Sequence, residues 1–191
     1  GDINTFLGSS SGLAKHSADG VATLQNRWGL TKEAAMGVFQ AHKLSGEAII
    51  PMIKSAAHSA ELALAEMGTR MDMKGVLEEA AKQTGVIRAQ AGGNLDILGR
   101  SVAVAKRFGT TLKEVAGASK QLLNFEQSIS AELEAELLTG KQLNLERARL
   151  AALTGDYETV TKEIMENVGG IEGFMKMNVL QQEALAKSVG V

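Results

Sequence analysis

Cysteine is absent from the 191 residues of this chain, so neither disulfide bonds nor thiolate metal sites can form. Aromatic residues make up only 4% of the chain, and proline occurs once, as Pro51. A hydrophobic core must therefore come from leucine, isoleucine, valine, methionine and alanine. No apolar run approaches the roughly 18 residues that a membrane-spanning helix needs.

The residues that are present are typical of a soluble globular protein. Hydrophobic residues account for 45% of the chain and charged residues for 22%. The net charge of -2 gives no general attraction to nucleic acid. The length suits one domain or two small ones with a real core. Because the first residue is Gly1 rather than Met, we expect a fragment or a processed product.

The hydrophobic pattern predicts helices along the whole chain, since strand-type alternation appears nowhere. Repeated glycines supply the left-handed residue that ends a helix. We therefore expect an all-α fold: a compact bundle of helical hairpins with at least six helices.

Polar caps define the helices of the first half. Thr31 is placed to cap a helix that runs to about Leu44, after an earlier helix over 13–28. A helix over 47–67 tolerates Pro51 in its first turn. Asp72 caps the next one, which ends at Thr84-Gly85.

The stretch Ala91-Gly92-Gly93-Asn94 is the weakest point of the middle region. It is either a hinge between two subdomains or a tight turn. We divide the chain here into an N-terminal helical subdomain, 1–91, and a C-terminal one, 92–191. One continuous domain is the alternative.

Thr111 and Glu114 form a capping box, which predicts one long helix near 112–138. Its apolar stripe is Leu112, Val115, Leu122, Phe125, Ile129, Leu133 and Leu137. A second helix, 141–153, is expected to pair back antiparallel across the Thr139-Gly140 turn. Leu133 and Leu137 would then face Leu143 and Leu150.

Two further caps complete the second half. Asp156 is placed to cap a helix that runs to Val168, and Asn178, with Gln181 three residues later, to cap the last helix.

Candidate catalytic groups are few. His16, His42 and His58 lie on separate predicted helices without metal-ligand spacing. We expect them to be exposed or partly packed. The sequence therefore offers no metal site, no cofactor-binding residue and no catalytic residue, and we expect no enzyme activity and no cofactor.

Acidic and basic residues cluster near the predicted hairpin. Glu132, Glu134 and Glu136 could supply paired carboxylates for glycoside hydrolysis, but a sugar cleft usually needs aromatic platforms. We expect a solvated acidic face instead. The cations of the following helix, Lys141, Arg147 and Arg149, would lie opposite and give a charge-complementary hairpin. Six methionines could be adaptable contacts or core filling, and we favour the core: Met67, Met71, Met73, Met165, Met175 and Met177.

Two strings carry a family resemblance: Leu-Leu-Thr-Gly-Lys-Gln-Leu-Asn-Leu-Glu at 137–146 and Met-Asn-Val-Leu-Gln-Gln-Glu-Ala-Leu-Ala at 177–186. With the helix–glycine–helix joint at 107–118, they resemble segments of tail tape measure proteins of tailed phages. The likeness is clearest over 85–191.

The resemblance implies a structural domain that acts in tail assembly, tail length determination and genome ejection. It implies a homo-oligomer whose partners are the tail tube, the baseplate hub and tail assembly chaperones. The location would be the tail lumen of the virion, and the host cytoplasm during assembly. Glycine breaks are too frequent for one extended ruler helix, so we expect a compact portion of the parent protein.

Two alternatives stay open. The turn at 151–158 resembles the turn between the helices of a tetratricopeptide repeat, although no 34-residue period is visible. Such a protein would be a scaffold for protein–protein contacts. A peptidoglycan-cleaving domain, which some tape measure proteins carry, is the third possibility.

Overall fold

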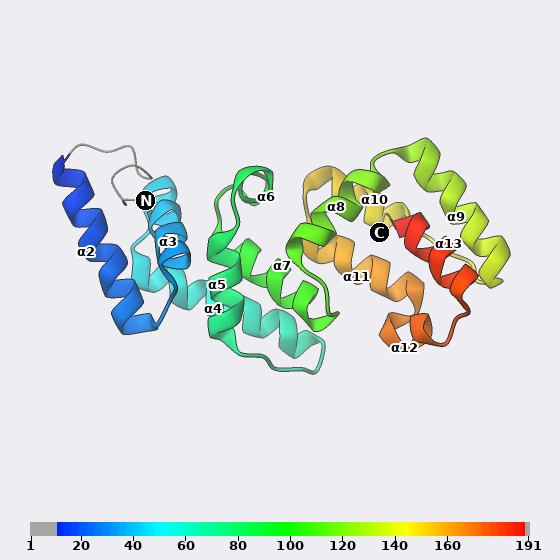
Figure 1. The fold of residues 1–191 in the computed structure, drawn as a ribbon, viewed down its shortest axis with the longest axis horizontal. Helices are drawn as coiled ribbons and strands as arrows, with labels where there is room; N and C mark the ends of the chain where they lie inside the picture. The colour runs from blue at the N-terminus through cyan, green and yellow to red at the C-terminus, as the bar shows by residue number, and fades with distance from the viewer. Residues whose placement is uncertain (1–10, 190–191) are drawn as a thin grey trace. The chain divides into compact units, whose positions relative to one another are not determined.

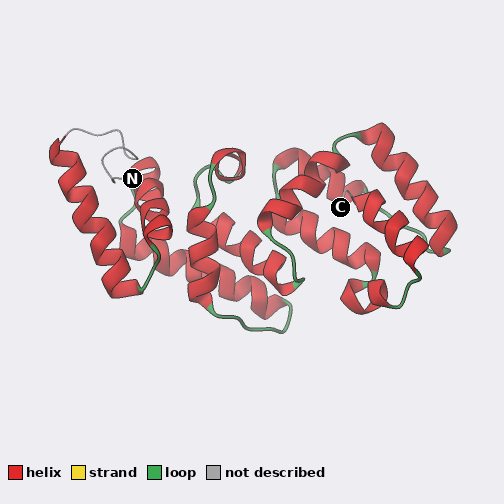
Figure 2. Ribbon diagram, viewed as in Figure 1, coloured by secondary structure: helices red, strands yellow, loops and turns green. Residues whose placement is uncertain are grey.

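The computed structural model describes residues 11–189 of the chain, with side chains from Asp19 onward. Over these residues the fold is all-α, with 12 helices and no strand (Figures 1 and 2), as the sequence predicts. The helices are α2 (Ser11–Trp28), α3 (Lys32–Ser45), α4 (Ile49–Glu66), α5 (Met73–Lys82), α6 (Gly85–Gln90), α7 (Leu95–Arg107), α8 (Leu112–Leu122), α9 (Phe125–Thr139), α10 (Glu146–Thr154), α11 (Tyr157–Val168), α12 (Gly170–Met175) and α13 (Val179–Val189).

The chain divides into two packed units. The first comprises residues 1–62 and 70–99, and the second comprises residues 63–69 and 100–191. The division therefore falls inside α4 and α7 and not at residues 91 and 92. Gly92 and Gly93 form a tight turn inside the first unit, with φ angles of 61° and 73° that favour glycine.

The predicted helix caps are present. Thr31 and Asp72 accept hydrogen bonds from first-turn amides of α3 and α5. Asp156 does the same for α11. Asn178 and Gln181 bond reciprocally at the start of α13, at 3.0 and 3.2 Å.

The capping box of α8 forms as expected. The Thr111 side chain accepts from the Glu114 amide, and the Glu114 carboxylate accepts from the Thr111 amide at 2.8 Å. That hydrogen bond, together with those from the Thr110 and Thr111 hydroxyls, lowers the pKa of Glu114.

Within the first unit, α3 packs against α5 around a buried arginine. The Arg88 guanidinium donates to the carbonyl oxygens of Gly37, Ala81 and Gln83 at 3.2, 2.6 and 2.7 Å. Two of these carbonyls lie at the C-terminal end of α5, where the helix dipole favours a cation. Burial lowers the pKa of Arg88.

The second unit corrects the prediction of one long helix over 112–138. Helix α8 ends at Leu122 and α9 begins at Phe125. Leu123 and Asn124 form the break, and the Asn124 carbonyl accepts the first hydrogen bond of α9 from Ser128 at 2.8 Å. Asparagine is a poor residue for a helix interior, although the Asn124 side chain makes no capping hydrogen bond here.

The predicted α9–α10 hairpin is also wrong. Helix α9 instead packs beside α13 (Figure 1), where it buries the small residues Ser128, Ala131 and Ala135. Helix α10 packs against α8 and α11 and begins only at Glu146, after a stretch without regular structure. Small side chains allow the close approach of α9 and α13, which the larger leucines of α9 would prevent.

Candidate functional site

The leucines expected to face a partner helix are exposed. Leu133 and Leu137 of α9 are 56% and 86% exposed, and Leu150 of α10 is 63% exposed, whereas Leu143 is buried. The break at Asn124 rotates α9 relative to α8, so the second half of the predicted stripe leaves the core. We call this line of exposed side chains on α9 the apolar ridge: Phe125, Ile129, Leu133 and Leu137.

A groove lies between the apolar ridge and α10. It is open to solvent and has a volume of about 510 Å³. Phe125 and Ile129 line it from α9, and Leu150 and Leu153 line it from α10. Because apolar side chains on two elements flank one depression, this α9–α10 groove is the main candidate contact site in the second unit.

The three glutamates expected to form a solvated acidic face, Glu132, Glu134 and Glu136 of α9, are engaged in structural bonds, which corrects that expectation. The Glu132 side chain is only 13% exposed, pairs with Arg149 and accepts from the Leu145 amide at 2.9 Å. Glu136 accepts from the Leu143 amide at 2.8 Å. Two carboxylates spaced by one helical turn thus hold the irregular segment 141–145 against α9.

The remaining glutamate, Glu134, is half exposed and pairs with Lys187 of α13 at 2.6 Å. The charge-complementary hairpin is correct only for Arg149, which pairs with Glu132. Arg147 instead pairs with Glu163 of α11 at 3.1 Å. Lys141 lies beside Gly169.

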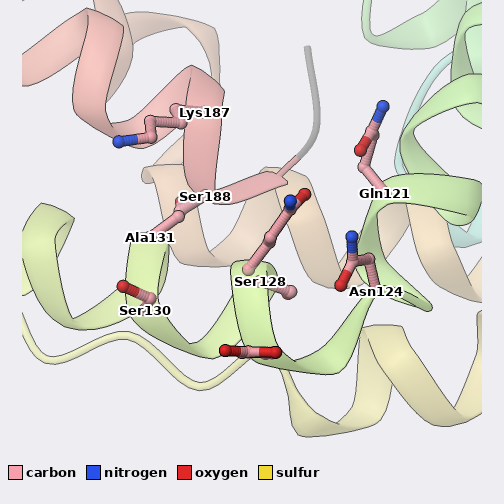
Figure 3. Close-up of a pocket in the computed structure, with 9 residues that line it drawn as sticks. Gln121, Asn124, Ser128, Ser130, Ala131, Lys187 and Ser188 are labelled. Atoms are coloured by element: carbon pink, nitrogen blue, oxygen red, sulfur yellow. The ribbon is translucent and has the colours of Figure 1, made fainter.

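A larger polar cleft of about 950 Å³ lies where the α8–α9 break meets the end of α13 (Figure 3). Its lining consists of amides, hydroxyls, one glutamate, one lysine and one alanine: Gln121, Asn124, Glu126, Gln127, Ser128, Ser130, Ala131, Lys187 and Ser188. Gln121 and Asn124 lie on one side and Lys187 on the other. Lys187 is already paired with Glu134 at 2.6 Å.

One ion-pair cluster joins four side chains of the second unit. Arg100 donates to Glu158 at 2.8 and 2.9 Å and lies 3.5 Å from Glu66. Lys162 pairs with Glu158 at 2.9 Å and with Glu66 at 3.3 Å. Burial alone would raise the pKa of Glu158, but the bonds from Arg100 and Lys162 outweigh it and lower that pKa.

The histidines stay apart. The His42 ring lies edge-on to Phe39 and donates through Nδ1 to the Glu47 carbonyl at 2.7 Å. His58 is exposed, and the side chain of His16 lies outside the described residues. Where side chains are described, no group of three histidines or carboxylates could hold a metal ion.

The methionines expected in the core are not buried. Met175 is 70% exposed, and the other five are partly exposed. The methionine that does fill the core is Met52 of α4, which the prediction did not include. Hydropathy cannot separate these cases, because it does not tell which side of a helix packs against a neighbour.

The fold and the site together define an all-α protein that has an open apolar groove and in which the candidate carboxylates are engaged in structural bonds. Comparison of the chain with protein-family models, with curated proteins and with solved structures finds no match. Over the described residues, no helix combines the length and apolar character required to cross a membrane.

Proposed function

We propose that this chain is a non-catalytic helical segment of a phage tail tape measure protein, acting in tail assembly, tail length determination and genome ejection. The resemblance at 137–146 and 177–186 supports the tail assignment. One observation carries it further: the two strings touch, because Gln181 of the second donates to the Leu138 carbonyl of the first at 3.1 Å. The two strings therefore contact each other within the second unit.

The mode of action that the geometry favours is docking through exposed side chains. The apolar ridge runs the length of α9 without a covering element among the described residues. Partners implied by the resemblance are the tail tube, the baseplate hub, assembly chaperones and further copies of the parent chain. They would meet it in the host cytoplasm during assembly and in the tail lumen of the virion.

Purified virions of the encoding phage provide the test. An antibody raised against this chain should detect its parent in intact particles and in isolated tails, and tails should fail to assemble when the gene is disrupted. Absence from particles that carry complete tails would refute the assignment. A housekeeping protein of the host serves as the control for contamination.

A tetratricopeptide-like scaffold is the second candidate. Its support is one hairpin, in which α10 and α11 meet at Gly155 and bury Ala151, Ala152 and Tyr157. Stacked repeats need helix pairs of similar length. The described helices of the second unit after α7 vary from 6 to 15 residues, so this support stays local.

A peptidoglycan-cleaving role has weaker support, because Glu132 and Glu136 accept hydrogen bonds from backbone amides that they would have to release to act on a substrate. We expect no turnover of purified cell wall by the chain. Turnover that disappears in Glu132→Gln would contradict this.

A further inference from the structure

The α9–α10 groove is apolar on both walls and open to solvent. Phe125 and Ile129 are 46% and 47% exposed, and Leu153 is 59% exposed. Single exposed apolar side chains are common, but several that flank one groove usually mark a contact site. Since these residues lie on two separate helices, a rod-shaped partner could contact both walls at once.

The floor of the groove is fixed by bonds inside the chain. Glu132 and Arg149 pair there, with side chains 13% and 11% exposed, and Glu132 also accepts from the Leu145 amide. Their charges compensate each other, so the floor presents little net charge to a partner. The pair also links α9 to α10, which keeps the two walls in place before anything binds.

The charge left uncompensated at the rim is negative. Glu146 lines the groove. It is exposed, and its carboxylate has no ion-pair partner among the described side chains. The nearest cation along the chain, Arg147, is paired with Glu163 instead. A partner with positive charge beside its apolar face would therefore be favoured.

We propose that the α9–α10 groove binds an amphipathic helix of another protein, with aliphatic residues on one face and lysine or arginine beside them. Helices that bind in grooves place apolar anchors at i, i+3 or i+4, and i+7. The part of α9 that lines the groove, from Phe125 to Glu132, is about 10 Å long, which matches about two turns of such a helix. This inference rests on the docking role proposed above but not on the tail assignment.

A second copy of the chain fits the groove less well. In a two-fold dimer the same patch of each copy meets the other. Each copy would then bring an uncompensated Glu146 to the same interface, and like charges brought together at an interface oppose association. A basic helix from a different protein avoids this repulsion.

Fluorescence anisotropy with the full chain tests the proposal. The probe is a labelled peptide of about 14 residues, with leucines at groove-binding spacing and lysines elsewhere. A matched peptide carries glutamate in place of lysine. The variants are Ile129→Ser, Leu153→Ser and Glu146→Lys. The control is Val86→Ser, because Val86 of α6 is also exposed, at 60%. Circular dichroism verifies that each variant keeps its helices.

The lysine peptide should bind, and Ile129→Ser and Leu153→Ser should each weaken it by about tenfold or more, since each removes a large aliphatic contact. Val86→Ser should change nothing. Glu146→Lys should weaken the lysine peptide and strengthen the glutamate peptide.

Three results would overturn the proposal: no binding of the lysine peptide up to about 1 mM, equal binding of both peptides, or a dimer of the chain that Ile129→Ser abolishes. None of them alters whether the chain occurs in phage particles, so this failure is distinguishable from failure of the tail assignment.

Discussion

At the scale of single residues, Gly37 shows how closely α3 and α5 approach. A Cβ at this position would lie 1.8 Å from the Ala81 carbonyl oxygen, which belongs to the backbone and cannot rotate away. The same oxygen accepts a hydrogen bond from Arg88. We expect Gly37→Ala to reduce the free energy of unfolding by about 1–3 kcal/mol, as overpacking of a core does. Urea denaturation followed by circular dichroism measures this.

Gly117 of α8 is the matched control, because it is also a helical glycine. A Cβ there meets nothing within 4 Å. Gly117→Ala should leave stability unchanged or raise it by up to about 1 kcal/mol, since alanine is the better helix former. Equal effects of the two substitutions would contradict the close α3–α5 contact.

Glu158 gives a prediction for pH. Its pKa in the folded chain lies below the ordinary 4.5. A carboxyl with a lowered folded pKa contributes stability above its unfolded pKa and loses it as the pH falls through the folded pKa. Glu158→Gln should therefore cost about 1–2 kcal/mol at neutral pH. The gap between the two proteins should shrink as the pH drops below 4.5.

Urea unfolding at a series of pH values tests this. Glu146→Gln is the control, because Glu146 has no ion-pair partner among the described side chains. A stability difference for Glu158→Gln that is the same at about pH 7 and about pH 3 would show that the carboxylate charge plays no part.

At the scale of elements, Leu137 and Leu145 of the 137–146 string should differ strongly in how much stability their replacement by alanine costs. Leu145 is fully buried, whereas Leu137 is 86% exposed. Leu145→Ala should cost about 2–5 kcal/mol through lost burial and the cavity left behind. Leu137→Ala should cost less than about 0.5 kcal/mol, as surface substitutions do. Similar costs for both substitutions would instead support the predicted hairpin, in which Leu137 faces the following helix.

The same elements show what sequence reasoning could reach. The caps at Thr31, Asp72 and Thr111 were predictable because donor and acceptor lie within one turn. The orientation of α9 could not be predicted, because the apolar residues keep a helical spacing on both sides of the break at Asn124. Its buried face consists of alanine and serine, which hydropathy does not mark as core.

The candidate site was missed for a related reason. Glu132 finds its partners at Leu145 and Arg149, in a segment whose position is set by tertiary packing. The apolar ridge has an apolar residue at every fourth position, and this can be seen in the sequence. The same spacing is expected of a helix face that is buried in a core, so the pattern alone does not distinguish the two. Only the position of α13 decides between the two, and no local pattern encodes that position.

At the scale of the whole molecule, the tail assignment depends on how a folded segment contributes to a length ruler. If residues 112–189 formed one extended helix along the tail, their deletion would shorten it by about 120 Å, at about 1.5 Å per residue. In the structure α9 lies beside α13 and α10 reverses into α11. The longest of these helices, α9, has 15 residues and spans only about 22 Å.

Deletion of the codons for 112–189 in the parent gene should therefore shorten tails by less than about half of the extended value, below about 60 Å. Electron microscopy of negatively stained tails measures the length. Duplication of the same codons is the complementary test, because it should lengthen tails by an equally small amount. A shortening close to 120 Å, mirrored by an equal lengthening on duplication, would mean that this segment unfolds into an extended rod inside the tail. The side-by-side packing of α9 and α13 would then belong to the free protein alone.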